Sequence, residues 1–218
     1  MFERLGEAKE LKAAGNGLFL KNQFAEAAAR YNDALVRLPP AGGDEENEAH
    51  EAAVTDQSHG GVSLDEHLGH EETIMLRTVL HCNLAACYLK LEQYKDAVDA
   101  STLALRDDEN NIKALHRRAC AYEGLGKWND LEKALKDYQK LAELDKEGYV
   151  PSDYGPELRA ALERVPRAIQ VAGESEKNEM FGKLKGLGNS ILGYFGLSTD
   201  NFKMSPQAGG GYSVNFER

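Results

Sequence analysis

The stretch from Leu11 to Leu38 reads LKAAGNGLFLKNQFAEAAARYNDALVRL and carries the pattern of two amphipathic helices joined by a turn. Apolar and small residues recur at helical spacing on both sides of Lys21-Asn22-Gln23, which predicts one helix before this turn and one after it. Pro39 and Pro40 predict the end of the second helix, because proline lacks an amide hydrogen and disfavours helix at the residue before it. The stretch therefore predicts a helical hairpin.

The hairpin pattern returns with a period of about 34 residues. Its small, aromatic and proline positions fall on Gly15, Leu18, Ala27, Tyr31, Ala34 and Pro39, then on Ala85, Tyr88, Ala97 and Ala104, then on Ala119 and Tyr122. The third repeat matches best with about three residues inserted near Trp128, which makes Ala134 and Tyr138 its alanine–aromatic pair. One hairpin cannot bury its apolar face alone, so such hairpins stack. The pattern resembles the tetratricopeptide repeat and predicts an all-α fold, a short α-solenoid of three hairpins; an unrelated helical bundle is the alternative.

The net charge of −10 is concentrated in one segment. Between Leu38 and Leu76 there are ten acids and no lysine or arginine, and removing these ten from the 36 acids leaves 26 against 26 bases in the rest of the chain. The segment also has few apolar residues, which predicts an acidic, disordered insertion. The expected boundaries are repeats at 1–39, 77–110 and 111–148, the insertion at 40–76, a capping helix and hinge at 149–177, and an extension at 178–218.

The C-terminal third begins with a predicted capping helix. Pro156 to Ile169 has apolar residues at spacings of four, three and four, which suits a helix that closes a solenoid with one apolar face. Residues 172–178 are polar and predict a hinge. A second amphipathic stretch runs from Met180 to Phe195, and Tyr212 to Phe216 alternates like a strand.

Polar residues on the first helix of each hairpin are candidates for function, because packing does not require them and these helices line the concave face of a solenoid. The candidates in the three helices are Lys12, Asn16 and Phe19, then Asn83, Ala86 and Lys90, then Lys113 and Arg117. Asn83 and Arg117 hold the same position in successive repeats, so the three faces are expected to converge on one groove.

These residue types suit a peptide that ends in a carboxylate beside an acidic side chain. Lysine and arginine neutralise negative charge and donate strong hydrogen bonds, and asparagine adds a donor without charge. Lys90 would reach a second acidic side chain at the rim. The alternative is that these are ordinary solvated residues, as most lysines and arginines on helices are.

Lys12-x3-Asn16, Asn83 and Lys113-x3-Arg117 resemble the two-carboxylate clamp of the tetratricopeptide-repeat co-chaperone family. The resemblance implies a cytoplasmic adaptor whose groove takes the acidic tail, ending Glu-Glu-Val-Asp, of heat-shock protein 90 or 70. It implies Lys12, Asn16, Asn83, Lys113 and Arg117 as the clamp, with Phe19, Ala86 and Lys90 as secondary groove residues.

The C-terminal third is similar to the tetratricopeptide repeat protein 1 family. Its most specific string is Phe195-Gly196-Leu197-Ser198-Thr199-Asp200-Asn201-Phe202, and Val165 to Ile169, Phe181 to Asn189 and Tyr212 to Phe216 add to it. Members of that family often carry a long acidic region before the first repeat, whereas here the acidic stretch follows the first repeat.

Other classes of function have little support in the sequence. Cys82, Cys87 and Cys120 make no CxxC pair, and the start at Met1 lacks the apolar core of a signal peptide, so a cytoplasmic protein with reduced thiols is expected. His67-Leu68-Gly69-His70-Glu71, with His50 and His59, is not a metal motif. No pairing of nucleophile and base suggests an enzyme: Cys87 and His116 are available in principle, but Cys87 falls among the packing residues of a repeat, which predicts a core thiol. We expect no cofactor, no metal, no nucleic acid and no membrane as partner.

Three alternatives remain open at the sequence level. In the first, the chain is an adaptor for another client, such as a signalling protein, which it binds through its convex face or its extension. In the second, the extension fills the groove of its own chain. In the third, the acidic insertion competes for the clamp as a carboxylate mimic.

Overall fold

The computed structural model describes residues 2–39, 64–206 and 212–216. In this part of the chain there are seven α-helices, one short 3-10 helix and two strands. They are α1 (Phe2–Leu20), α2 (Phe24–Arg37), α3 (Leu64–Lys90), α4 (Tyr94–Asp107), α5 (Ile112–Leu125), α6 (Trp128–Lys146), α7 (Gly155–Gly193), η1 (Thr199–Asn201), β1 (Phe202–Pro206) and β2 (Tyr212–Phe216).

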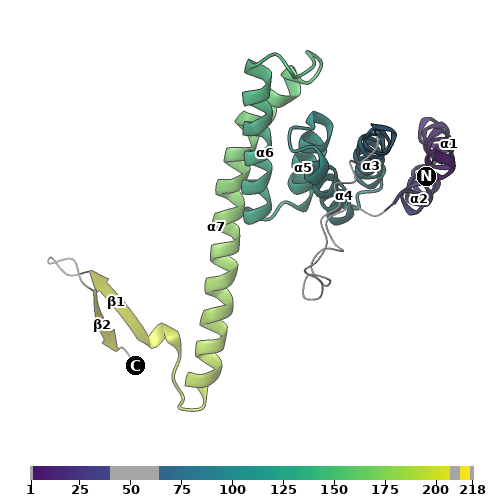
Figure 1. Cartoon of the computed structure of the whole chain (residues 1–218). Coiled ribbons are helices and arrows are strands. Elements are labelled where there is room, and N and C mark those ends of the chain that lie inside the picture. The colour runs from purple at the N-terminus through teal and green to yellow at the C-terminus, as the bar shows by residue number, and fades with distance from the viewer. Residues whose placement is uncertain (1, 40–63, 207–211, 217–218) are drawn as a thin grey trace, which may run out of the picture.

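The first six helices form three stacked hairpins, as predicted (Figure 1). Helix α1 packs on α2, α3 on α4 and α5 on α6, and each hairpin packs on the next one along the chain. The first helices lie side by side as well, because α3 contacts both α1 and α5. The all-α solenoid expected from the sequence is therefore confirmed, and the three faces chosen as candidates lie on neighbouring helices.

The repeat residues form the core. Tyr31 and Tyr138 are among the largest fully buried side chains, and the small residues that recur at the repeat positions are buried between helices. The turns inside the hairpins place one residue each in the left-handed region, Asn22 at φ 60°, Glu92 at 57° and Gly126 at 67°. These turns bring consecutive helices back antiparallel and so let the apolar faces meet.

The predicted insertion of three residues near Trp128 is wrong. The second helix of each hairpin begins nine residues after the small residue of the first, at Phe24, Tyr94 and Trp128 after Gly15, Ala85 and Ala119. Leu131 and Tyr138 therefore occupy the positions that alanines hold in the other two repeats, and both are buried. These larger side chains made the third repeat match the pattern best in a wrong register. The third repeat is longer because helix α6 is longer.

Helix α3 begins at Leu64, earlier than the expected repeat boundary at 77. Thr73 and Leu76 are buried, and the Thr73 hydroxyl donates to the Gly69 carbonyl at 2.8 Å. Leu5 of α1 belongs to the same core cluster as Leu76, and Lys9 pairs with Glu72. The long α1 thus gives the first half of α3 a surface to pack on, which the acidic composition did not reveal. Residues 40–63 of the expected insertion lie outside the described part of the chain.

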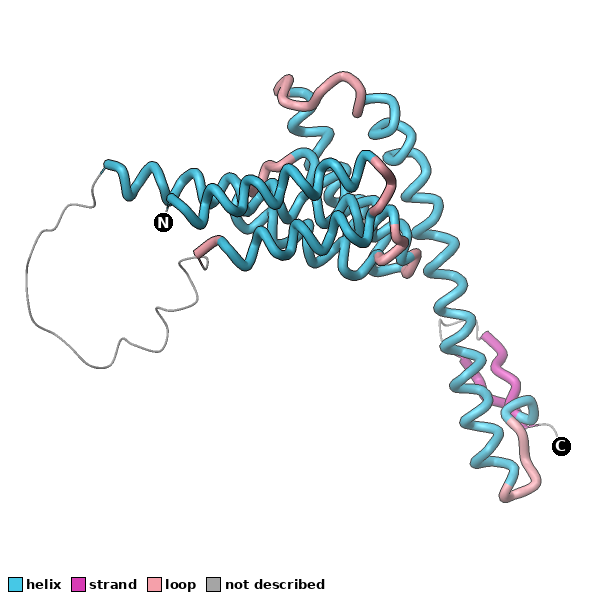
Figure 2. Tube along the Cα trace, turned by 90° about the vertical axis from the view of Figure 1, so that its right-hand side faces the viewer, coloured by secondary structure: helices cyan, strands magenta, loops and turns pink. Residues whose placement is uncertain are grey.

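The hinge predicted at 172–178 is also wrong, because these residues continue α7 as helix (Figure 2). Leu158, Ala161 and Val165 are buried against the last hairpin, so the start of α7 is the predicted cap. The helix then runs beyond the solenoid as an arm. Its polar segment consists mainly of good helix formers, which need no apolar face to continue a helix that is already nucleated.

The extension ends in a two-stranded antiparallel hairpin in which Phe202 pairs with Phe216 and Ser205 with Ser213. The alternation at Tyr212–Phe216 was predicted, and its partner strand β1 was not. No helix in the described residues is both long enough and apolar enough to cross a lipid bilayer.

Candidate functional site

A cleft of about 230 Å³ opens between the first helices of the three hairpins. It is lined by Asn16, Phe19, Leu20, Tyr31, Asn83, Ala86 and Arg117. Five of the eight residues singled out from the sequence therefore meet here, and they come from α1, α3 and α5. Leu20 and Tyr31 complete the lining and were not among the candidates.

The two asparagines of the cleft are joined through one oxygen atom. Asn16 Oδ1 accepts a hydrogen bond from the Tyr31 hydroxyl at 2.8 Å and another from Asn83 Nδ2 at 3.3 Å. Because its oxygen is occupied twice, the Asn16 side chain is left with its amide hydrogens to offer a ligand. The arrangement suits an acceptor such as a carboxylate better than a donor.

Tyr31 holds this arrangement from inside the core. Its side chain is 1 % exposed, and burial raises the pKa of its phenol to about 12, so the hydroxyl is a neutral donor at physiological pH. A Cβ added at Gly15 would lie only 2.6 Å from Tyr31 Cε1. The absence of a side chain at Gly15 therefore lets the ring lie directly under α1 and reach Asn16.

Arg117 supplies the cationic side of the cleft. The half-buried guanidinium donates to the Cys82 carbonyl at 2.6 Å, which ties α5 to α3 and fixes the charge beside the asparagines. The neighbouring Cys82 thiol lies 3.4 Å from Asn111 Oδ1, the side-chain oxygen that caps α5. Arg117 therefore both joins two repeats and places a positive charge at the floor of the groove.

Lys12 and Lys113 flank this cleft but do not line it. Lys113 is exposed and Lys12 is half-exposed, and neither forms an ion pair with any residue in 2–39, 64–206 or 212–216. Their ammonium groups lie on long flexible stems. The structure thus brings together the two asparagines and Arg117. Lys12 and Lys113 lie on α1 and α5, the helices of Asn16 and Arg117, but outside the lining of the cleft.

A second cleft of about 610 Å³ adjoins the first and shares Phe19, Ala86 and Arg117 with it. Lys90 lies here, as a residue at the rim of the groove should. The other side is formed by residues that the sequence did not single out for binding: His116, Cys120, Asp153, Tyr154 and Glu157. Tyr154 precedes α7, so the capping helix completes a groove wall that the repeat pattern alone could not locate.

The His116 imidazole and the Cys120 thiol line the second cleft, whereas the Cys87 thiol is fully buried in the core. Burial lowers the pKa of His116, whose ring stands perpendicular to that of Tyr154 at 5.1 Å. Burial raises the pKa of the Cys120 thiol, 3.8 Å from the imidazole nitrogens, and raises that of Cys87 to about 11. Both effects favour the neutral forms, whereas a reactive cysteine needs its thiolate.

The structure shows no metal-binding cluster in its described residues, where no three histidine, cysteine or acidic side chains are grouped for one ion. Of the candidate metal-binding histidines, His50 and His59 lie outside the described residues, and so does the side chain of His67.

Known proteins with similar sequences and structures share the repeat fold. No family model matches the chain. It is 30 % identical over 184 residues to human mitochondrial import receptor subunit TOM34, an alignment that covers 79 % of this chain and 49 % of TOM34. The chain spans less than half the length of the curated relatives it matches.

Two solved structures extend the comparison. The tetratricopeptide-repeat domain of a Plasmodium falciparum FK506-binding protein matches with 25 % identity and a TM-score of 0.58, over 79 % of this chain and 94 % of that domain. The first repeat domain of Spaghetti (RPAP3), bound to the HSP90 peptide SRMEEVD, matches with 21 % identity and a TM-score of 0.51, over 76 % of this chain and 94 % of that one. The chain thus has the tetratricopeptide-repeat fold and is similar to repeat domains of this kind.

Proposed function

We propose that this chain is a cytoplasmic protein-binding adaptor, a co-chaperone, whose groove takes the acidic C-terminal tail of heat-shock protein 90 or 70. The observation that carries the proposal is the cleft itself. Two asparagines and one arginine from three successive repeats converge there, and the Asn16 oxygen already accepts two hydrogen bonds from within the protein. A site that presents donors and positive charge, and no carboxylate of its own, is matched to an anion.

Each clamp residue has a distinct part in this mechanism. The Asn16 and Asn83 amides donate to the terminal carboxylate, and Arg117 adds charge at the floor. Lys12 and Lys113, exposed on either side, close on the tail from α1 and α5 and hold the terminal carboxylate and the last aspartate side chain. Lys90, Phe19 and Ala86 accompany the preceding residues into the second cleft.

The comparison with the Spaghetti domain supports this choice of ligand, because that domain binds a peptide ending Glu-Glu-Val-Asp in the same fold. We expect micromolar affinity for so short a segment, since ordering an extended tail offsets much of the contact energy. Binding should weaken with salt, because the contacts are charged and partly exposed. We also propose that the chain belongs to the tetratricopeptide repeat protein 1 family, which its C-terminal third resembles.

Single variants test the assignment of roles. The peptide Met-Glu-Glu-Val-Asp is titrated by calorimetry into the wild type, Lys113→Ala and Lys12→Ala, with Lys95→Ala on α4 as the matched control of an exposed lysine outside the groove. Each clamp variant should lose about tenfold or more in affinity, since each removes a charge-assisted hydrogen bond. Equal affinity in all four proteins would refute the clamp. Because Lys113 is exposed, its loss should leave the thermal unfolding unchanged.

A further inference from the structure

The arm of α7 beyond the solenoid carries a row of uncovered apolar side chains. Met180, Leu184, Leu187, Ile191 and Tyr194 are spaced four, three, four and three residues apart, and their side chains are 57–90 % exposed. This is the spacing of a coiled-coil seam, in which alternate steps of three and four keep one stripe facing a partner helix. We call these five residues the α7 seam. A helix with such a seam is built to lie against another helix.

The terminal hairpin adds a second uncovered apolar face. Phe202, Tyr212, Val214 and Phe216 lie on one face by the strand register, with the rings of Phe202 and Phe216 at 5.4 Å. All four are exposed, whereas Lys203, Ser213 and Asn215 lie on the opposite face. A two-stranded sheet is at best marginally stable when nothing covers its apolar side. The hairpin therefore needs the same kind of cover as the helix.

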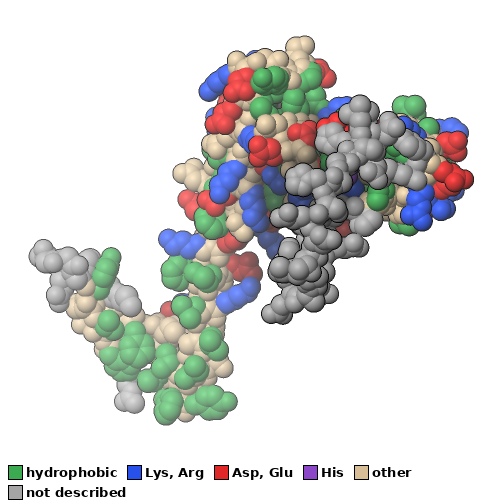
Figure 3. Space-filling view, viewed as in Figure 1, with side chains coloured by type: hydrophobic (Ala, Val, Ile, Leu, Met, Phe, Trp, Pro, Cys, Tyr) green, Lys and Arg blue, Asp and Glu red, His purple; other side chains and the backbone are tan. Residues whose placement is uncertain are grey.

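The seam lines a cleft of about 570 Å³ at the far end of the arm, and Thr199 and Asp200 of η1 form its other side. The hairpin is anchored beside α7 because Asn189 Oδ1 accepts from the Thr199 backbone N–H at 2.6 Å and from the Ser198 hydroxyl at 3.2 Å. Gly188 leaves room for this approach, since a Cβ there would meet Thr199 Cγ2 at 2.9 Å. Beyond the anchor the strands diverge from the helix (Figure 1), and hydrophobic side chains gather over this end of the molecule (Figure 3).

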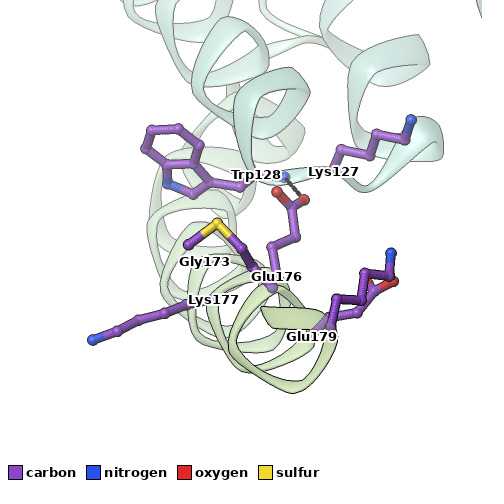
Figure 4. Close-up of a pocket in the computed structure, with 8 residues that line it drawn as sticks. Lys127, Trp128, Gly173, Glu176, Lys177 and Glu179 are labelled. Carbon is purple, nitrogen blue, oxygen red and sulfur yellow. Dashed lines mark hydrogen bonds and ion pairs between the residues drawn. The ribbon is translucent and has the colours of Figure 1, made fainter. Parts of the chain in front are cut away.

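The seam continues to the solenoid, where a wider cleft of about 840 Å³ lies between the start of α6 and the arm. Trp128, 43 % exposed, and Met180 form its apolar part. Both carboxylates in it are engaged: Glu176 accepts the Trp128 backbone N–H at 2.8 Å (Figure 4), and Glu179 pairs with Lys183 at 2.6 Å. Lys127 and Lys177 extend on opposite sides of the cleft and give this end a positive rim.

We propose that the arm binds an amphipathic α-helix of a partner protein, seated along the α7 seam between Trp128 and the terminal hairpin. The bound helix presents apolar residues at steps of three and four and carries aspartate or glutamate at the end that faces Lys127 and Lys177. Such helix-in-groove recognition is read by apolar anchors on one face, with charge setting the direction.

Charge separates this occupant from the two others that an apolar arm could attract. Residues 172–218 carry five acids and five bases, so the arm has no excess of basic residues for an anionic lipid surface. A second copy would bring no acidic excess to this surface, because the arm is balanced and the net charge of −10 lies in the segment between Leu38 and Leu76. The seam itself is neutral, and the cleft at its solenoid end has three lysines against two glutamates that are already engaged. A helix with an apolar face and an acidic end fits both features.

Selection from a helix library tests the proposal directly. A phage-displayed library of α-helical peptides about three heptads long is selected on the full chain, and one enriched peptide is synthesised for titration. Enriched sequences should carry apolar residues at steps of three and four and acids at one end. The peptide should lose about tenfold or more in affinity for Leu187→Gln/Ile191→Gln, and again for Lys127→Glu/Lys177→Glu.

The matched control is Val36→Gln, an exposed apolar residue on α2, which should bind the peptide as the wild type does. All substituted side chains are exposed, so circular dichroism melts should coincide. Enrichment without the heptad pattern, or equal binding to the Leu187→Gln/Ile191→Gln variant, would overturn the proposal. So would a dimer in sedimentation velocity, or co-flotation with vesicles of phosphatidylcholine and phosphatidylserine. None of these outcomes depends on whether the groove binds chaperone tails.

Discussion

At the scale of single residues, the Asn16 side chain depends on Tyr31 for its orientation. Replacing Tyr31 by phenylalanine removes the hydroxyl that donates to Asn16 Oδ1 and keeps the ring that fills the core. The amide can then rotate, and we expect the affinity for an acidic tail to fall about threefold to tenfold, the value of one net hydrogen bond. Calorimetric titration measures this change.

Tyr138→Phe is the matched control for this substitution. Tyr138 is equally buried, but its hydroxyl donates to Glu123 at 2.7 Å, away from the cleft of Asn16. Its loss should lower stability and leave tail affinity unchanged. If both variants bound the tail like the wild type, the orienting role of Tyr31 would be disproved.

Two glycines on α1 should respond in opposite directions to alanine. At Gly15 the new methyl group would collide with the buried Tyr31 ring, so Gly15→Ala should cost about 1–3 kcal/mol of unfolding free energy. At Gly17 nothing lies within 4 Å of the added carbon, so Gly17→Ala should stabilise by up to about 1 kcal/mol through helix propensity. Urea unfolding of both variants checks this, and equal signs would contradict the close approach at Gly15.

Two partly buried histidines should make the protein less stable in acid. Burial lowers the pKa of His81, which faces Asp107 and Arg77, and of His116, which faces Glu157, Glu123 and Arg117. Their contribution is therefore complete above the ordinary value of 6.5 and is lost as the pH falls below it, because only the unfolded chain takes up the protons readily.

Urea unfolding at pH 7.5 and pH 5.5 measures this loss of stability. His116→Gln should reduce the difference between the two pH values, and the same change at the exposed His70 should not. A pH dependence identical in all three proteins would show that His116 makes no contribution.

At the scale of helices, an ion pair between Arg118 and Asp137 joins α5 to α6. Both carboxylate oxygens accept from the guanidinium at 2.8 Å, and Asp137 is only 6 % exposed. Arg118→Ala would leave this carboxylate buried without its partner and should cost about 3–5 kcal/mol. Lys183→Ala, which breaks the fully exposed pair with Glu179, should cost much less. Chemical denaturation compares them, and similar costs would refute this role of the ion pair.

How far the sequence predicts an element depends on what determines that element. The three hairpins follow from small residues and aromatics at fixed steps, which is local information. The register of α6 was misassigned because Leu131 and Tyr138 replace alanines, and only packing reveals that their larger side chains fit. The first half of α3 was missed because its support comes from α1, far away in the sequence.

The same distinction holds for the candidate site. The spacing of Asn16, Asn83 and Arg117 within the repeats predicted that they would meet, and they do. The hydrogen bond from Tyr31 and the wall formed by Tyr154 were not predicted, because each joins elements whose relative position the sequence does not state. Lys12 and Lys113 stay proposals, since flexible exposed side chains take up their bound positions only with a ligand.

At the scale of the whole molecule, a solenoid with a concave groove carries an arm that leaves it (Figure 2). The first cleft of the groove offers donors and positive charge, whereas the arm offers an apolar seam. Helix α7 contributes to both the groove and the arm, because its start lines the second cleft and its continuation forms the arm. We therefore expect the tail and the helix to bind independently, as an adaptor that joins two proteins requires.

The most direct test of the central claim is a calorimetric titration of the full chain with Met-Glu-Glu-Val-Asp, beside the same peptide amidated at its C-terminus. We expect micromolar binding of the free carboxylate and none of the amide, because the proposed clamp depends on that terminal charge. Equal binding of the two peptides, or no heat with either from a folded protein, would contradict it.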